Sequence, residues 1–335
     1  MVYLTLLLML LIILIAAEVF TNALEHLGER LKISEGVTGS VFAAVGTALP
    51  ETLVPLLAIF AGTANQQLNE DIGVGAILGA PLMLSTLTLF LMAVATIKKR
   101  GISGEFKPER SGLTRDLNFF LFAFSLAVGA LYVPHSMSTA RTVIGITLVL
   151  TYFVYILLTL RASEKLVQDG HGTEAHHPMF LTRLGLPDNM GTIIVQLVLG
   201  VGLLVGGAKG FINGVEEAST LLGISPLVLS LLIIPIATEL PEKINSVLWI
   251  RKHKDTLAFG NITGAMVFQG TLLPAIGIML TPWDPRVEIL SGIVITLVAA
   301  LWMRLLLVRG GRLHVWHVAF NGSLYLGYLA IVISR

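Results

Sequence analysis

Two short segments of the chain carry a proline followed by a carboxylate inside long apolar stretches. The first reads GTALPE and ends at Glu51, and the second reads ATELPEK and has Glu242 at the same place in the motif. A carboxylate at the depth of a lipid bilayer is costly and by default marks a functional site. Because the order Thr, Leu, Pro, Glu recurs, we interpret Glu51 and Glu242 as equivalent members of one site.

The composition indicates a polytopic membrane protein. Of the 335 residues, 55% are hydrophobic and only 13% are charged, whereas about 25% of residues are charged in soluble domains. The net charge of +1 does not indicate nucleic-acid binding, and we predict no nucleic-acid partner. The chain has no cysteine, which excludes disulfides and thiolate metal ligands.

Apolar stretches of about 20 residues, the length that crosses a bilayer core, occur ten times along the chain. Five of them precede a polar loop and five follow it. They begin near Tyr3, Gly36, Ile72, Leu117, Arg141, Met190, Ser225, Thr256, Glu288 and Leu313. We therefore expect an all-α integral membrane protein with ten transmembrane helices, for which the lipid bilayer is a partner.

The basic residues predict the orientation. Of the 22 Lys and Arg residues, 17 fall on one set of alternate loops, which includes the polar central loop, three fall on the other set and two lie within spans. Short cytoplasmic loops carry such an excess of positive charge. We therefore expect a protein of the cell membrane with both termini outside and the long central loop in the cytoplasm.

The two halves of the chain repeat each other. AEVFTNALEHLGERLKIS, from Ala17, aligns without a gap with AKGFINGVEEASTLLGIS, from Ala208. The predicted domains are a first five-helix repeat over 1–161, a linker over 162–188 and a second five-helix repeat over 189–335. An odd number of spans turns the second copy upside down, which is the inverted-repeat architecture of many transporters, with the substrate near the midplane.

The proline in each motif predicts free backbone oxygens beside the carboxylate. Proline has no N–H, so a carbonyl four residues earlier loses its helical donor, and this is tolerable where it lines a polar cavity. An oxygen-only site suits a hard cation such as Ca²⁺. The competing interpretation is structural, with each glutamate protonated or paired in a kinked helix. The candidate cation ligands are Glu51, Glu242, the hydroxyls of Thr47 and Thr238, one helical turn before the carboxylates, and the carbonyls of Gly46 and Ala237.

The second motif adds two charges, Glu239 and Lys243, which stand in the favourable i,i+4 order for an ion pair. With Glu51 and Glu242 they would sum to −2, enough for one divalent ion. Alternatively, the Lys243 ammonium takes the place of a monovalent cation and its deprotonation couples transport to H⁺, because a desolvated lysine changes its pKa readily. A third possibility is that Lys243 extends toward the cytoplasm near Arg251.

These motifs resemble those of the cation/calcium exchanger superfamily, which includes the sodium/calcium exchangers. GTALPE and ATELPE are similar to the family's GTSLPE motif, and residues 75–84 and 260–269 match its second motif more loosely. The resemblance covers nearly the whole chain. It implies ten spans in two inverted repeats and cation antiport by alternating access, with Glu51 and Glu242 as central ligands.

The chain departs from the family at polar positions of the second motif. Ala80 and Leu84 stand there in the first repeat, and Ala265 and Gln269 stand there in the second. These positions help to form the Na⁺ sites in the family, and only Gln269 has a side chain that could bind a cation here. The usual multi-sodium stoichiometry is therefore not expected.

The leading hypothesis is a secondary active antiporter that exchanges Ca²⁺, or a related divalent cation, against Na⁺ and uses no cofactor. The alternative is H⁺-coupled exchange through Lys243 and Glu239. An intramembrane enzyme and a channel are remote alternatives. The chain has no HExxH and no G-x-S-x-G motif, and no Asp falls inside a predicted span. No oligomeric state is predicted.

Overall fold

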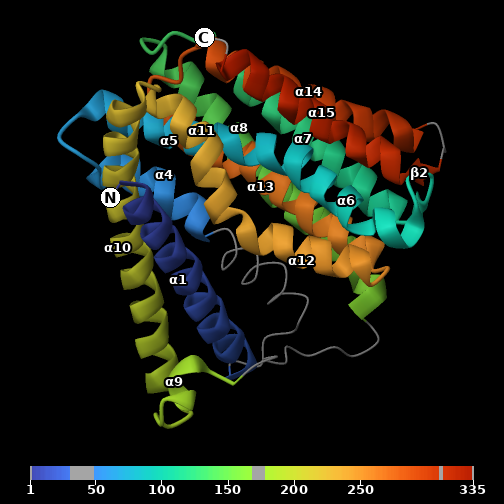
Figure 1. Cartoon of the computed structure of the whole chain (residues 1–335), viewed down its shortest axis with the longest axis horizontal. Coiled ribbons are helices and arrows are strands. Elements are labelled where there is room, and N and C mark those ends of the chain that lie inside the picture. Colours follow the sequence, from blue (N-terminus) through green and yellow to red (C-terminus); the bar gives the residue numbers. More distant parts are fainter. Residues whose placement is uncertain (1, 31–48, 168–177, 309–311, 334–335) are drawn as a thin grey trace. The chain divides into compact units, whose positions relative to one another are not determined.

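The computed structural model describes residues 2–30, 49–167, 178–308 and 312–333, which form helices joined by short connections (Figure 1). Within these residues, the strands are confined to one short antiparallel pair, in which Glu105 pairs with His314 and Phe106 with Leu313. The chain divides into two compact units, each discontinuous in sequence. Unit 1 contains residues 1–69 and 156–223, and unit 2 contains residues 70–155 and 224–335.

Unit 1 is built on two long antiparallel helices, α1 and α10, which lie side by side (Figure 1). Three glycines of α10 at seven-residue spacing allow this close approach, because a Cβ on any of them would lie 3.0 Å or less from an α1 side chain. Small residues serve this purpose where helices meet in membranes. The helices lying wholly in unit 1 are α1 (Val2–Arg30), α4 (Leu49–Ala61), α9 (Phe180–Arg183) and α10 (Met190–Leu222). The three glycines are Gly200, Gly207 and Gly214, which face Phe20, Ile13 and Leu6 in turn.

A buried amide pair also joins α1 to α10. Gln196 Nε2 donates to Asn22 Oδ1 at 2.9 Å and to the carbonyl of Val19 at 3.0 Å. Asn22 Oδ1 also accepts from the backbone N–H of Phe180 at 3.1 Å, and Gln196 Oε1 accepts from the backbone N–H of Leu181 at 2.9 Å. The short helix α9 is therefore held by the same two side chains that hold α1 on α10.

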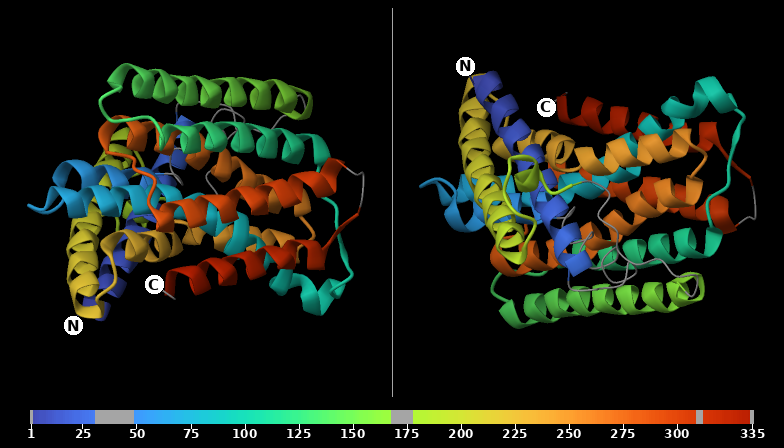
Figure 2. Two further views of the ribbon diagram at one scale, coloured as in Figure 1. Left: turned by 90° about the horizontal axis from the view of Figure 1, so that it is seen from above. Right: turned by 90° about the horizontal axis from the view of Figure 1, so that it is seen from below.

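Unit 2 contains most of the remaining helices. Helix α13 lies against α7 and α12, and α15 lies against α6 and α14 (Figure 2). Helices α5 and α8 begin or end in unit 1. The elements are α5 (Gln66–Met83), the π-helical turn η2 (Leu84–Thr88), α6 (Leu89–Arg100), β1 (Glu105–Phe106), α7 (Arg110–Ala130), α8 (Ser138–Val167), α11 (Pro226–Thr238), α12 (Leu240–Arg251), α13 (Asp255–Leu280), α14 (Val287–Val308), β2 (Leu313–His314) and α15 (Val315–Ile333).

The described helices confirm the predicted class of helical membrane protein. Eight of them are long and apolar enough to cross a membrane. Two shorter apolar helices, Glu51–Phe60 and Pro226–Ile236, lie where the other two spans were predicted, and part of the span expected from Gly36 falls outside the described residues. Helix α7 begins at Arg110, whereas hydropathy placed the start of this span near Leu117. Hydropathy missed the first two turns of the helix because they are rich in charged residues.

A buried arginine caps the C-terminal end of α13. Arg141 is 3% exposed and donates to the carbonyls of Ile278, Thr281 and Pro282 at 2.5, 2.5 and 2.7 Å. The last carbonyls of a helix have no partners within the helix, and a positive charge is favourable beside them. Arg141 of α8 therefore satisfies the C-terminal end of α13.

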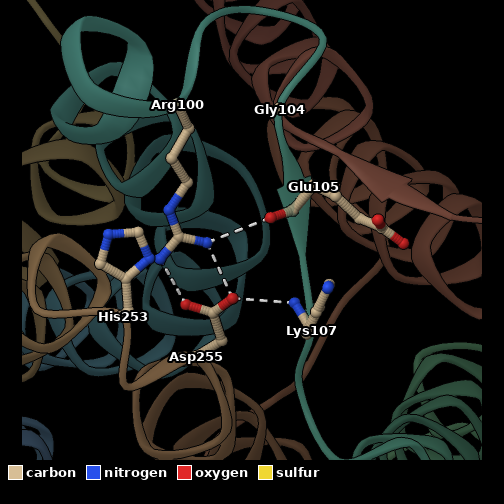
Figure 3. A pocket seen from close by; sticks show the side chains of 6 residues that line it. All are labelled: Arg100, Gly104, Glu105, Lys107, His253 and Asp255. Carbon is tan, nitrogen blue, oxygen red and sulfur yellow. Dashed lines mark hydrogen bonds and ion pairs between the residues drawn. The ribbon is translucent and has the colours of Figure 1, made fainter.

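The beginning of α13 is held by a buried ion pair (Figure 3). Arg100 contacts both carboxylate oxygens of Asp255, at 2.8 and 2.6 Å, and also donates to the carbonyl of Ile250 at 2.8 Å. The backbone N–H of Lys107 donates to the same carboxylate at 2.8 Å. These residues connect α6, the segment after β1 and the turn between α12 and α13. Beside the pair lies a cavity of about 410 Å³, lined by Arg100, Gly104, Glu105, Lys107, His253 and Asp255.

We predict that Asp255→Asn strongly destabilises the protein. Both side chains of the pair are only 7% exposed, and removing one partner of a buried pair leaves an uncompensated charge, which costs about 3–5 kcal/mol. Chemical denaturation of the purified protein in detergent measures the change in the free energy of unfolding.

The matched control is Asp188→Asn, which breaks the exposed Arg30–Asp188 pair, whose side chains are 45% and 59% exposed. An exposed pair contributes about 0–1 kcal/mol, so this variant should unfold almost like the wild type. Equal losses in the two variants would contradict the role assigned to the buried pair.

Candidate cation-binding site

The second motif lies where one predicted helix is interrupted. Helix α11 ends at Thr238 and α12 begins at Leu240, with Glu239 between them at φ −87° and ψ 5°. Pro241 is the second residue of α12, and its missing N–H is harmless there because the first N–H groups of a helix lack helical partners anyway. The sequence predicted one span from Ser225, whereas the structure has two short helices that meet at a carboxylate.

Helix α11 contacts α5 very closely. Pro235 lies inside α11, so the carbonyl of Leu231 loses its helical donor. Gly79 of α5 lies against this carbonyl, and a Cβ there would be 2.4 Å from the Leu231 oxygen. One turn earlier, a Cβ on Gly75 would be 2.1 Å from Ser230 Oγ. The glycines of the loosely matched second motif therefore serve helix packing in the first repeat.

Glu239 and Gln269, which the sequence placed in separate motifs, meet in unit 2. Gln269 Nε2 donates to Glu239 Oε1, and the two residues are 0% and 2% exposed. The other oxygen of each side chain, Glu239 Oε2 and Gln269 Oε1, is buried with no hydrogen-bond partner among the described residues. Buried polar atoms are rarely left unsatisfied, so these two oxygens are available to a cation.

Lys243 turns its ammonium back toward α11. The residue is 5% exposed, and its Nζ donates to the carbonyl of Pro235 at 2.7 Å. Pro235 precedes Lys243 in the chain, so the side chain extends away from the Arg251 end of α12, contrary to the possibility that it reaches toward that end.

Glu242 lies in the first turn of α12 and is 5% exposed. A negative charge is stabilised there by the helix dipole. Asn261 of α13 holds this turn, because its Nδ2 donates to the carbonyl of Glu242 at 3.2 Å and to Ser246 Oγ at 3.0 Å. Asn261 therefore positions the backbone that carries the carboxylate.

Thr238 is the last residue of α11 and is 2% exposed. Its hydroxyl donates to the carbonyl of Ile234 at 3.2 Å, which leaves the oxygen as an acceptor. The predicted one-turn spacing of Thr238 and Glu242 assumed a continuous helix, whereas the two lie on either side of the interruption at Glu239. Ala237 lies in the last turn of α11.

The first motif is described only in part. Glu51 belongs to α4 in unit 1 and is 4% exposed, so it is a buried carboxylate like Glu242. Gly46 and Thr47, the other predicted ligands of the first repeat, lie outside the described residues.

Sequence reasoning missed three buried aspartates within the candidate membrane spans, Asp71, Asp116 and Asp255, which are 9%, 5% and 7% exposed. Asp116 lies within α7 and is 5% exposed, so the prediction that no Asp falls inside a span is wrong. Its oxygens accept from Thr263 Oγ1 at 2.7 Å and Tyr155 Oη at 3.2 Å. The charged residues around Asp116 lower the local hydropathy, so hydropathy alone predicted a loop for this part of α7.

We predict that Gln269→Leu costs about 1–3 kcal/mol in the free energy of unfolding, because it leaves the buried Glu239 Oε1 without its donor. The same substitution in a Glu239→Leu background should cost clearly less, since the acceptor is already gone. A double-mutant cycle measured by denaturation in detergent gives this coupling. Equal costs in the two backgrounds would show that the hydrogen bond is unimportant.

The fold and this site define a class of protein: a polytopic helical membrane protein with buried carboxylates at an interrupted helix. The family model of the sodium/calcium exchanger proteins matches residues 1–161 and 192–334. The chain therefore belongs to the sodium/calcium exchanger family, and it is a cation antiporter of that family rather than an enzyme.

Relatives and solved structures agree with this assignment. The putative antiporter CaxA of Alkalimonas amylolytica is 26% identical over 271 residues, which cover 80% of this chain and 77% of the relative. The inner membrane protein YrbG of Escherichia coli K12 is also 26% identical, over 280 residues that cover 82% of this chain and 78% of the relative.

Two solved exchangers share the fold. The H⁺/Ca²⁺ exchanger CAX superposes with a TM-score of 0.71 at 18% identity, covering 99% of this chain and 82% of CAX. The sodium-calcium exchanger NCX_Mj superposes with a TM-score of 0.58 at 19% identity, covering 97% of this chain and 96% of NCX_Mj.

Proposed function

We propose that the protein exchanges Ca²⁺, or a related divalent cation, against Na⁺ by alternating access. The observation that carries this proposal is the group of buried oxygens at the break between α11 and α12. Glu239 Oε2 and Gln269 Oε1 are buried acceptors without hydrogen-bond partners among the described residues, and Glu242 is buried one turn away. Carboxylate and amide oxygens are the ligands that Ca²⁺ prefers.

In the proposed site, Glu51 and Glu242 are the central ligands of the divalent cation. Glu239 and Gln269 add oxygens in the second repeat, and Lys243 compensates one negative charge. With these residues ionised, the four charged side chains sum to −2 and match a divalent ion. The remaining proposed ligands are the hydroxyls of Thr47 and Thr238 and the carbonyls of Gly46 and Ala237.

The proposed architecture is two inverted five-helix repeats, over 1–161 and 189–335, joined by a linker over 162–188. The matching motifs in the two halves of the sequence support it, because inverted repeats place equivalent segments at the midplane of the membrane. The excess of Lys and Arg on alternate loops supports external termini and a cytoplasmic linker.

A second candidate function is exchange of the divalent cation against H⁺. One observation favours it: the buried ammonium of Lys243 donates to the carbonyl of Pro235 at 2.7 Å, at a proline-interrupted helix where a backbone oxygen could otherwise face a monovalent cation. In this version, loss of the proton from Lys243 accompanies binding of the divalent cation. One of the solved neighbours in fold is an H⁺/Ca²⁺ exchanger.

In proteoliposomes, we predict that an imposed Na⁺ gradient drives ⁴⁵Ca²⁺ uptake and that Glu51→Gln or Glu242→Gln abolishes it. Each substitution removes one charge that balances the divalent ion but keeps the shape of the side chain. The control is Glu217→Gln, which changes an exposed carboxylate of α10 and should leave uptake unchanged. Uptake that persists in both site variants would refute the proposed ligands.

A pH gradient in the absence of Na⁺ separates the two counter-ions. Under the leading proposal it drives no ⁴⁵Ca²⁺ uptake, and Lys243→Met weakens Na⁺-driven uptake by changing the net charge of the site. Uptake that follows the pH gradient, ignores Na⁺ and is lost in Lys243→Met establishes the H⁺ version instead. The readout is the initial rate of uptake at matched expression in the membrane.

A further inference from the structure

The first turn of α15 is joined to the loop that connects α6 with α7, beside the β1–β2 pair (Figure 1). The backbone N–H of Val315 donates to the carbonyl of Gly104 at 2.9 Å. The N–H of the next residue, Trp316, donates to the carbonyl of Ile102 at 3.1 Å. Because the first N–H groups of a helix have no partners within the helix, the loop supplies the acceptors that this end of α15 needs.

His317 completes the cap from inside the helix. It is the third residue of α15, and its Nδ1 accepts the backbone N–H of His314, the residue before the helix, at 3.0 Å. In a capping box, a Glu or Gln side chain at the third helical position reaches back in the same way to the N–H of the capping residue. In α15 this place is taken by a side chain that titrates near neutral pH.

The contact requires a neutral His317. A backbone N–H can only donate, so Nδ1 of His317 presents its lone pair and the ring hydrogen lies on Nε2. Protonation places a hydrogen on both ring nitrogens and thereby removes the acceptor. It also places a positive charge in the first turn of a helix, where the helix dipole disfavours cations. Both effects weaken the cap.

The second histidine acts in the same direction. Nδ1 of His314 lies 2.9 Å from the carbonyl of Ser103, and because a carbonyl only accepts, this nitrogen carries a hydrogen. The ring centroids of His314 and His317 are 5.3 Å apart. Two protonated rings at this spacing repel each other, so the closed cap is further disfavoured when both are charged.

The surroundings of His317 do not compensate a positive charge. Helix α14 presents the neutral Trp302, whose Nε1 donates to the carbonyl of His317 at 2.9 Å. Basic side chains outnumber carboxylates on the other segments around this turn. The charged residues there are Lys98, Lys99 and Arg100 at the end of α6, Glu105, Lys107 and Glu109 in the loop, Arg304 in α14 and Arg312 before β2.

The loop that caps α15 also reaches the beginning of α13. Arg100 donates to the carbonyl of Glu105 at 3.2 Å, and the N–H of Lys107 donates to the carboxylate of Asp255 at 2.8 Å. The β1 segment is therefore held at α15 by the cap and at α13 by the buried ion pair.

We propose that the cap of α15 is a pH-sensitive latch, closed while His317 is neutral and opened when His317 is protonated. In the closed form, His317 holds the N–H of His314 and so keeps β2 and the first turn of α15 in place against β1. Opening releases the loop from α15 and leaves it attached at α13. An unperturbed histidine has a pKa of about 6.5, so the latch is closed above this pH and opens as the pH falls below it.

Hydrogen exchange of the purified protein in detergent, followed by mass spectrometry, tests the latch at about pH 8 and about pH 5, the range over which histidine titrates. The readout is the protection factor, corrected for the intrinsic pH dependence of amide exchange, in peptides that cover residues 101–107 and 313–317. In the wild type, protection should fall by about 5-fold or more at the lower pH, the scale of losing a helix cap. Peptides from α10 in unit 1 are the internal reference and should keep their protection.

Two substitutions of His317 separate its titration from its contact. His317→Asn keeps an acceptor oxygen at the position of Nδ1 and cannot be protonated, so protection should stay high at both pH values. His317→Leu removes the acceptor, so protection should be low at both. The matched controls are His314→Asn, which keeps the backbone N–H that His317 accepts, and His135→Asn, which changes an exposed histidine between α7 and α8. Both controls should still lose protection at the lower pH.

A wild-type protein whose protection does not change with pH overturns the latch. So does a loss at low pH that His317→Asn shares, including one that also reaches α10, because the titrating group then lies elsewhere. Wild-type protection in His317→Leu at the higher pH overturns it as well, since the Nδ1 contact then does not hold the cap. A loss seen in the wild type and both controls but absent in His317→Asn supports it.

Discussion

The burial of ionisable groups inside a membrane protein is the constraint on which the rest of this structure depends. Glu239, Glu242 and Lys243 are each 5% exposed or less, and a buried charge is tolerated only where other groups compensate it. Gln269 donates to Glu239, and the carbonyl of Pro235 accepts from Lys243. At the break between α11 and α12, backbone and side-chain groups therefore together compensate the charges that are buried in the interior of unit 2.

Helix α13 is the frame against which this charged segment is held. Its first residue, Asp255, is paired with Arg100, and its last carbonyls are bound by Arg141. Between these two fixed ends, Asn261 holds the first turn of α12 and Gln269 reaches Glu239. A rigid support of this kind is what a binding site needs if its ligands are to keep their geometry.

The structure shows what occupies the positions at which this sequence departs from the second motif of the family. In the first repeat, the glycines of the second motif allow α11 to approach α5, and a side chain at Gly79 would collide with the Leu231 carbonyl. The polar groups of that helical run lie after Leu84 instead, in a π-helical turn that faces Asn321 of α15. In this helical run the apolar Leu84 stands at the family's polar position, and the buried hydroxyls of Ser85, Thr86 and Thr88 follow it.

The sequence by itself determined the class of the protein, the positions of most spans and the repeated carboxylate motif, because apolar length and motif order are local properties of the chain. Hydropathy failed at α7, where charged residues in the first turns hid Asp116 inside a helix. Only the tertiary structure decided that Lys243 points toward Pro235, that Gln269 meets Glu239 and that Asn321 lies on Ser85. Each of these depends on two segments far apart in the chain, or on a helix break that apolar periodicity does not record, so no local pattern could have specified them.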